Sequence, residues 1–509
     1  MKKNVLEYLE NTASINPNKP AIMDKDRSIS FDALHKKAKG LGTVIHHKNN
    51  QLKQPIAAFL PKGLEGILSF LGILYSGNFY VPLDIKSPKK RIQAIIENLE
   101  PMFIITSQQY IEVLKSIDIE EKNIIVLDKI YDSLQTYDDE CLQNIQSKMI
   151  GTDPIYTMYT SGSTGIPKGV VIPHIAVIDY IDWMIDQFEI NSNTIIGNQA
   201  PFYFDISQVD LYLSLATAAT LVIIPEQLFS FPIKLIEYVN QTKINFIFWV
   251  PSVFINVANS QILEEFDDCS LRKILFIGEV MPTRHFNYWK RCLPNALYAN
   301  LYGPTEATLA CTYFIIDREF KDHEPLPIGS PCLNTDIMIL NDSGNEVRDH
   351  EVGELCVRGS SLALGYWNDE EKTKAVFIQN PLHNNYPELI YRTGDLVYYN
   401  ENKELMYIGR NDSQIKHMGY RIELGEIENT ILSLKEFDTV CIIYNKIKRE
   451  ITMFYTTNMN MSDREVRRKL ADIIPKYMIP SVFYHLNKLP LNQNLKIDRV
   501  KLANKYLEK

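Results

Sequence analysis

The sequence predicts an α/β protein with a large N-terminal domain of mixed sheets and flanking helices, a β-rich subdomain, and a small C-terminal α+β domain. Three observations predict it. Short apolar runs alternate with helical patterns over about the first 310 residues. From about residue 325, short strands follow one another with Asn, Asp and Gly turns. After Arg410 a second, smaller set of helices and strands begins.

The N-terminal runs are bounded by Pro, Ser or Asp, which is typical of buried parallel strands. They lie at 56–61, 78–83, 102–107 and 123–128, and again at 220–225, 245–251 and 273–278. Helical patterns such as 91–100 lie between them. Another helix, opened by Asp32, is expected near the N-terminus. The alternation predicts parallel strands joined by crossover helices.

The residue pattern differs in the C-terminal part of the sequence. The β-rich segment comprises 337–347, 353–367 and 391–410. Two helices at 423–434 and 463–475 then alternate with two strands at 439–445 and 450–456. A boundary near Asp412 predicts domains at 1–411 and 412–509.

Composition excludes several classes of protein. The chain has 509 residues, 45% of them apolar and 23% charged, which is ordinary for a soluble globular protein. The net charge of −9 gives no global basic field for nucleic acid. The apolar passage at 211–225 is too short to cross a membrane, so no membrane insertion is expected. Seven cysteines without a CxxC pair indicate a reducing, cytoplasmic location.

The most informative motif is YTMYTSGSTGIPKGVVIPH, at 156–174. A strand leads into a loop whose glycines let backbone N–H groups approach an anion, while its hydroxyls add donors and a lysine adds positive charge. The spacing does not fit a Walker A loop. The motif predicts a phosphate-binding loop made of Thr160, Ser161, Gly162, Ser163, Thr164, Gly165 and Lys168.

TSGSTGIPKG resembles the signature of the adenylate-forming (AMP-binding) superfamily, which includes acyl-CoA synthetases, luciferases and the adenylation domains of peptide synthetases. Four further strings match the family's order, at 301–308 (LYGPTEAT), 391–396 (YRTGDL), 409–428 and 489–499. Five ordered motifs are far more specific than any one of them. The resemblance implies an ATP-dependent ligase that uses ATP and Mg²⁺ and releases pyrophosphate.

The resemblance also implies the catalytic residues. A carboxylate must attack the α-phosphate of ATP, and because both are anions the site needs cations. By resemblance, Lys496 bridges the two reacting groups, Glu306 binds the magnesium ion and Thr305 contacts phosphate. Leu495 stands where the family usually has glycine.

The implied nucleotide contacts lie near the second and third motifs. Tyr302 resembles the residue that stacks on adenine, and Asn300 the one that reads its amino edge. Asp395 resembles the carboxylate that accepts the ribose hydroxyls, and Arg410 the arginine near ribose and phosphate. With the loop residues, the expected nucleotide-binding set is completed by Gly303, Thr305 and Lys496.

The family's C-terminal domain is mobile, and Asp412 resembles its hinge. After adenylation the domain swings so that a different face meets the site. Lys416 and Gly419 belong to the segment that would then line the tunnel for a thiol. The expected thiol is the phosphopantetheine arm of a separate carrier protein, because the chain ends shortly after Lys496.

The segment 202–215 matches the one that carries an aspartate in amino-acid-activating members of the family. Asp205 would pair with the substrate α-ammonium, and its alternative role is a helix cap. The other aligned pocket positions are all apolar, which favours a small apolar amino acid. They are Ile206, Val209, Phe248, Leu275, Ile277, Leu301, Leu309 and Ala310.

Two subfamilies fit this pocket. The strings at 276–282 and 300–312 resemble D-alanine–carrier protein ligase, although Ile277 stands where that subfamily usually has cysteine. The other is a free-standing adenylation enzyme of peptide-synthetase type for alanine, proline or a similar residue. An acyl-CoA or aryl-acid ligase, and a nucleotide binder without catalysis, are the less favoured alternatives. The expected substrate is alanine, with its enantiomer left open.

Overall fold

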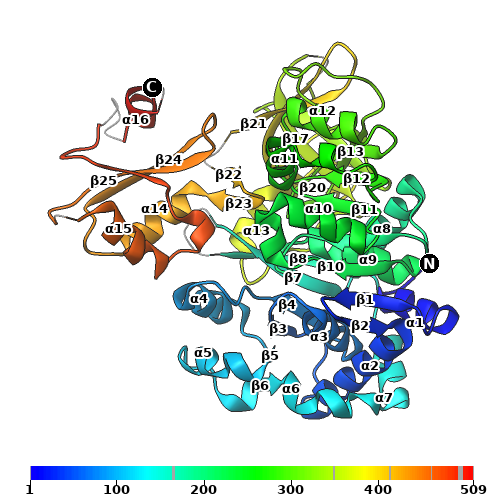
Figure 1. Cartoon of the computed structure of the whole chain (residues 1–509). Helices are drawn as coiled ribbons and strands as arrows, with labels where there is room; N and C mark the ends of the chain where they lie inside the picture. The colour runs from blue at the N-terminus through cyan, green and yellow to red at the C-terminus, as the bar shows by residue number, and fades with distance from the viewer. Residues whose placement is uncertain are drawn as a thin grey trace. The chain divides into compact units, whose positions relative to one another are not determined.

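The computed structural model describes residues 2–162, 167–347, 350–411, 414–459, 461–490 and 497–507. The chain divides into two compact units (Figure 1). The first comprises Met1–Leu83, Glu100–Met158 and Gly169–Asn411, and the second comprises Asp84–Leu99, Tyr159–Lys168 and Asp412–Lys509. In the described part of the chain, no helix combines the length and the apolar character needed to cross a membrane.

A seven-stranded sheet contains the first group of predicted strands. Its order is β18-β8-β7-β4-β3-β5-β6, and the apolar runs near the N-terminus form β3 to β6, which pair in parallel. The strands are β3 (Pro55–Phe59), β4 (Phe79–Pro82), β5 (Phe103–Thr106), β6 (Ile124–Val126), β7 (Pro154–Thr160), β8 (Lys168–Pro173) and β18 (Gly365–Tyr366).

A nine-stranded sheet follows the order β15-β14-β13-β12-β11-β9-β10-β1-β2. Its strands from β13 to β1 are parallel, and β14, β15 and β2 pair antiparallel at its two edges. The strands are β1 (Pro20–Asp24), β2 (Arg27–Ser30), β9 (Ile195–Asn198), β10 (Thr220–Ile223), β11 (Phe246–Trp249), β12 (Lys273–Phe276), β13 (Leu297–Tyr302), β14 (Thr312–Ile315) and β15 (Ser330–Pro331).

Both faces of this sheet are buried, which explains its continuous apolar strands. In β11, Phe248 belongs to one core cluster while its neighbours Ile247 and Trp249 belong to another. In β12, Leu275 and Phe276 divide in the same way. Since successive side chains of a strand point to opposite faces, each strand supplies both cores.

Along the chain, the helices of the first unit alternate with its strands, as the sequence pattern predicted (Figure 1). The helix expected near the N-terminus begins at Phe31, and its N-cap is Ser30 rather than Asp32, because the Ser30 hydroxyl accepts the Ala33 N–H. The longer helices are α1 (Leu6–Ile15), α2 (Phe31–Lys48), α3 (Leu64–Tyr75), α7 (Asp139–Ser147), α8 (His174–Phe188), α9 (Ile206–Thr217), α10 (Pro232–Gln241), α11 (Pro251–Ser260) and α12 (Thr283–Cys292).

The β-rich segment forms a five-stranded antiparallel sheet with the order β16-β17-β20-β19, in which β21 also pairs with β20. Its strands are β16 (Thr335–Leu340), β17 (Gly353–Gly359), β19 (Phe377–Gln379), β20 (Leu389–Tyr399) and β21 (Leu405–Arg410). The helix α13 (Glu370–Val376) precedes β19.

The second unit combines a hairpin, a three-stranded sheet and helices. Its core packs apolar residues of α14, α15, β24 and β25. The elements are α4 (Lys89–Leu99), β22 (Gln414–His417), β23 (Tyr420–Glu423), α14 (Leu424–Leu432), β24 (Thr439–Asn445), β25 (Glu450–Thr456), α15 (Asp463–Ala471), β26 (Val482–His485) and α16 (Arg499–Tyr506). Together with the first unit, this confirms the predicted α/β class of mixed sheets with flanking helices.

Candidate functional site

The predicted site residues of the first unit follow parallel strands. β9, β11, β12 and β13 run in the same direction in the nine-stranded sheet, so their carboxyl ends meet at one edge. Asp205 follows β9, Ile277 follows β12, and Gly303 follows β13. The carboxyl edge of such a sheet is where α/β proteins bind ligands.

The turn after β13 is tight and strained. A Cβ at Gly303 would lie 2.5 Å from Ala310 Cα and 2.5 Å from the Leu309 carbonyl oxygen, so the closing backbone leaves room only for glycine. Thr308 and Leu309 both have positive φ, 49° and 76°, which is costly for residues other than glycine. The turn places Thr305 and Glu306 in the short 3₁₀ helix Thr305–Ala307.

Glu306 is fully buried, and the hydroxyl of Tyr366 donates a 2.7 Å hydrogen bond to its Oε1. The Glu306 carbonyl accepts the backbone N–H of Ala363. Tyr366 lies in β18 and Ala363 just before it, so a segment distant in sequence fixes both ends of the residue. A buried carboxylate of this kind has the hard oxygen atoms that Mg²⁺ binds.

Tyr302, Asp395 and Arg410 form one buried cluster. The Tyr302 hydroxyl donates a short hydrogen bond to Asp395 Oδ2, and Arg410 Nη1 donates to Asp395 Oδ1 at 2.9 Å. Burial and the Asp395 carboxylate hold the pKa of the Tyr302 hydroxyl well above its usual value, so the hydroxyl remains a donor. The structure thus brings three predicted nucleotide contacts together. Asn300 is also buried, and its Nδ2 donates to the Pro327 carbonyl at 2.7 Å.

The predicted phosphate-binding loop is described only in part. Thr160 ends β7, and Lys168 begins β8. Among the described residues, the Thr160 hydroxyl is buried without a hydrogen-bond partner. An orphaned hydroxyl at the start of such a loop suits a ligand with acceptor oxygens, such as a phosphate. Ser163, Thr164 and Gly165 lie outside the described residues.

The next two loop residues contact the C-terminal part of their own unit. The Ser161 hydroxyl donates to the Arg421 carbonyl at 2.8 Å and accepts the Glu423 N–H at 3.1 Å. The Gly162 N–H donates to Glu426 Oε2 at 3.2 Å. The Glu426 carboxylate therefore accepts a backbone N–H of the loop that a phosphate oxygen could accept instead.

Asp205 occupies the N-cap of α9, where its Oδ1 accepts the Ile206 N–H at 2.9 Å. The capping role weighed from the sequence is thus present. The bond to the Ile206 N–H engages one oxygen of the Asp205 carboxylate, and a carboxylate has lone pairs for further donors. Asp205 is half-buried, and its charge contributes to raising the pKa of the buried Tyr156 hydroxyl.

The apolar residues expected around the substrate are all buried in the same core cluster as Tyr156. Phe248 and Leu275 lie directly opposite each other on β11 and β12. The full set is Ile206, Val209, Phe248, Leu275, Ile277, Leu301, Leu309 and Ala310.

The residues expected to act from the C-terminal part are described less fully. Lys496 and Asp412 lie outside the described residues. Lys416 lies in β22, and Gly419 follows Met418 in the two-residue turn between β22 and β23. Both turn residues have positive φ, 53° and 82°, as a tight hairpin requires.

Three residues that make such buried contacts were not among the site residues predicted from the sequence. Tyr366, which fixes Glu306, lies in an apolar stretch without a distinctive pattern. Glu426 and Arg91 form a buried ion pair within the second unit, and both lie on helices that read as ordinary amphipathic segments. The one indication in the sequence was that Glu426 lies inside the string 409–428, which resembles the family.

The sequence is similar to a known protein family and to several known proteins. Residues 9–367 match the family described as AMP-binding enzyme. Tyrocidine synthase 1 of Brevibacillus parabrevis is 29% identical over 98% of this chain and 44% of its own length. The chain spans less than half the length of the first curated relatives it matches.

Two solved structures share the fold. The Vibrio cholerae adenylation domain AlmE, solved with glycyl-adenosine-5′-phosphate, has a TM-score of 0.82 and 22% identity, covering 100% of this chain and 98% of its own. NpsA-ThdA, an artificially fused adenylation–PCP di-domain from Klebsiella oxytoca, has a TM-score of 0.80 and 21% identity, covering 96% and 94%. Because the family match covers more than half of the chain, this protein belongs to the AMP-binding enzyme family.

Proposed function

We propose that the chain is an ATP-dependent, AMP-forming ligase that converts a small apolar amino acid to its aminoacyl-AMP, with release of pyrophosphate. The observation that carries the proposal is the buried cluster of Tyr302, Asp395 and Arg410 beside β13, the strand whose end also presents Glu306. A buried carboxylate with oriented donors suits the ribose hydroxyls of a nucleotide.

Each residue contributes one part of the chemistry. Asp395 would accept the ribose hydroxyls while Arg410 and Tyr302 hold its carboxylate in place. Thr160 would donate its buried hydroxyl to a phosphate oxygen. Glu306 would hold Mg²⁺, which when bound supplies positive charge to offset the repulsion between the reacting anions.

Lys496 is proposed as the cation that bridges the substrate carboxylate and the α-phosphate. Domains at 1–411 and 412–509 would let this lysine act in the first half-reaction only, with Asp412 as the hinge. Rotation at a single loop residue is an established mode of domain closure. Lys416 and Gly419 would then serve the second half-reaction.

The substrate is proposed to be alanine, in either enantiomer, or another small residue such as proline. Asp205 would pair with the α-ammonium, and the surrounding apolar side chains would leave a charged substrate side chain without a partner. AlmE, which shares the fold, was solved with a glycyl adenylate, the smallest of this class. That supports a small substrate side chain.

The acceptor is proposed to be the phosphopantetheine thiol of a carrier protein. In NpsA-ThdA an adenylation domain is fused to a PCP, a carrier domain, which supports this partner. Transfer would yield an aminoacyl thioester and AMP.

An acyl-CoA or aryl-acid ligase is the second candidate. The observation that favours it is the bond from the Ile206 N–H to Asp205, since a carboxylate that only caps α9 would leave no recognition of an amino group.

Amino-acid-dependent pyrophosphate exchange tests the proposal. The panel contains glycine, L-alanine, D-alanine and proline, with a fatty acid and an aromatic acid as competitors. We expect exchange with a small amino acid, a rise in its KM in Asp205→Asn, and at least about a hundredfold loss in Lys496→Ala. Asp186→Asn, on the exposed face of α8, is the matched control. Exchange with only the fatty or aromatic acid, unaffected in Asp205→Asn, would establish the second candidate instead.

A further inference from the structure

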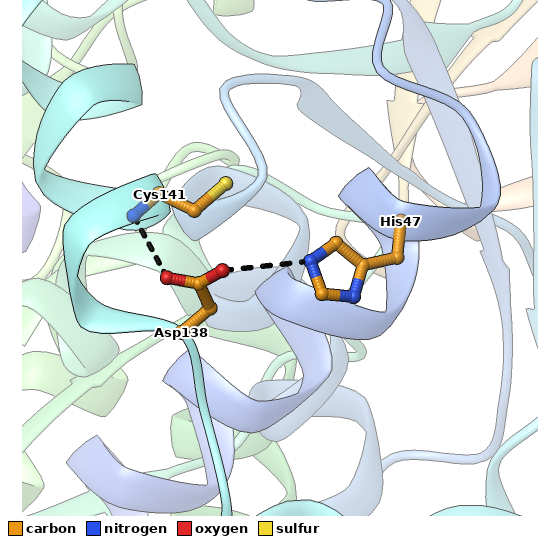
Figure 2. A group of neighbouring side chains, drawn as sticks. All are labelled: His47, Asp138 and Cys141. Carbon is orange, nitrogen blue, oxygen red and sulfur yellow. Dashed lines mark hydrogen bonds and ion pairs between the residues drawn. The ribbon is translucent and has the colours of Figure 1, made fainter.

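Three potential metal ligands meet where α2 and α7 contact each other, among residues that the proposed adenylation chemistry does not use. They are His47, Asp138 and Cys141, and each offers one ligand atom (Figure 2). These atoms all lie within 4.8 Å of one another. We propose that the three residues form a binding site for a divalent transition metal ion of the zinc class.

The distances suit such an ion. His47 Nε2 lies 3.7 Å from Asp138 Oδ2. Two ligands about 2.1 Å from a tetrahedral zinc ion are separated by about 3.4 Å, so this pair needs to close by only a few tenths of an ångström. The Cys141 Sγ lies within 4.8 Å of both atoms. His47 lies on α2, and Asp138 is the N-cap residue just before α7, as Figure 2 shows. An ion between them would therefore connect α2 to α7.

Asp138 can bind the ion and keep its structural role. Its Oδ1 accepts the Cys141 N–H at 3.0 Å, which caps α7. Its Oδ2 faces His47. One oxygen thus fixes the carboxylate while the other is directed at the ligand group, an arrangement typical of oriented metal ligands.

The backbones that carry the ligands are already fixed. The Asp138 N–H donates to Thr43 Oγ1 at 3.1 Å, one turn before His47 on α2. Lys39 Nζ forms a 2.6 Å ion pair with Asp139. Gly40 allows the backbone of Leu134 to approach α2 so closely that a Cβ there would overlap it. Little backbone ordering would therefore accompany metal binding.

The donor set selects the kind of ion. Imidazole nitrogen, carboxylate oxygen and cysteine sulfur together favour zinc and neighbouring transition metals over Mg²⁺, which prefers oxygen ligands. The charges of Asp138 and a Cys141 thiolate would offset the charge of a divalent ion. Three protein ligands leave a fourth tetrahedral position for water.

Zinc titration of the purified, chelator-treated full chain in the presence of excess Mg²⁺ tests the site. We expect one equivalent of Zn²⁺ to bind. His47→Gln, Cys141→Ser and Asp138→Asn should each weaken binding at least about tenfold. Asn is a good N-cap, so the last variant keeps α7 capped. Cys292→Ser and His323→Gln alter a partly buried cysteine and an exposed histidine elsewhere, and should bind Zn²⁺ like the wild type.

Cobalt provides a second readout that loss of folding cannot mimic. Co²⁺ bound to the wild type should show a thiolate-to-cobalt charge-transfer band, which Cys141→Ser loses and Cys292→Ser keeps. Because the ion would bind the folded state, Zn²⁺ should also raise the unfolding temperature of the wild type more than that of His47→Gln. The proposal is wrong if the double variant His47→Gln/Cys141→Ser binds Zn²⁺ as tightly as the wild type, or if the cobalt band is absent.

Discussion

Arg410 and Asp395 face each other across β21 and β20, and Arg410 Nη1 donates a 2.9 Å hydrogen bond to Asp395 Oδ1. Their side chains are only 10% and 4% exposed. The Tyr302 hydroxyl occupies a lone pair of the other carboxylate oxygen. The carboxylate therefore cannot rotate freely, and its remaining lone pairs have fixed directions, as recognition of a pair of hydroxyls requires.

We expect Asp395→Asn to raise the KM for ATP by at least about tenfold, because hydrogen bonds to a charged acceptor contribute more than those to a neutral one. The rate of pyrophosphate exchange, measured at a series of ATP concentrations, gives this KM. Asp336→Asn is the control, since Asp336 pairs with Arg358 on the same sheet but is largely exposed. An equal change of KM in both variants would contradict a nucleotide role for Asp395.

The buried ion pair between Arg91 and Glu426 is expected to matter for stability. Their side chains are 10% and 2% exposed. Glu426→Gln leaves the Arg91 charge buried without its partner, so the free energy of unfolding should fall by about 3 kcal/mol. Urea denaturation measures this. Glu436→Gln breaks the more exposed pair with Lys469 and should cost about 1 kcal/mol or less. Equal losses would show that burial of the first pair has no special effect.

The sequence predicted the fold well where the signal was local. Apolar runs bounded by Pro, Ser or Asp became β3 to β6, because a strand buried on both faces leaves that pattern. The helix start was wrong by two residues, since both Ser30 and Asp32 are good caps and only the structure shows which one accepts a backbone N–H.

The site was predicted only as far as the motifs extend. They contain Tyr302, Asp395 and Arg410, whose contact the structure brings out. Partners distant in sequence left no signal. Tyr366 reaches Glu306 from 60 residues away, and Arg91 reaches Glu426 from 335 away. Such pairs depend on tertiary packing, which periodicity cannot encode.

Asp210 should make stability depend on pH. It is fully buried on α9, and burial raises its pKa to about 8, while Asn198 and Lys62 oppose the shift. Between about pH 4 and pH 8 the folded chain keeps a proton that the unfolded chain releases. The free energy of unfolding therefore falls as pH rises, by up to about 1.4 kcal/mol per pH unit from this group.

Asp210→Asn removes this dependence and keeps an acceptor for the Asn198 amide. We expect the variant to gain stability relative to the wild type between pH 5 and pH 8 in urea denaturation. Asp186→Asn, exposed on α8, should track the wild type across the same range. A constant difference between Asp210→Asn and the wild type over this range would contradict the assignment.

Gly303→Ala should distort the turn that presents Thr305 and Glu306. The added Cβ would overlap backbone atoms of Leu309 and Ala310, which cannot move aside like a flexible side chain. We expect a loss of stability of at least about 1 kcal/mol and a larger loss of pyrophosphate exchange. Gly409→Ala is the matched control for space, because a Cβ there meets nothing within 4 Å. Normal exchange in Gly303→Ala would show that the tight turn is not needed for the reaction.

Gly419→Ala should separate the two proposed half-reactions. Gly419 has a φ of 82° in the turn between β22 and β23, where a Cβ costs about 1 kcal/mol. The strained hairpin should slow transfer to a carrier thiol more than it slows pyrophosphate exchange, because only transfer is proposed to use this segment. Gly344→Ala introduces similar strain, at a φ of 76°, into a turn of the β-rich sheet and should affect neither rate selectively. If Gly419→Ala lowered both rates equally, the hairpin would have no separate part in transfer, and the assignment of Lys416 and Gly419 to the second half-reaction would fail.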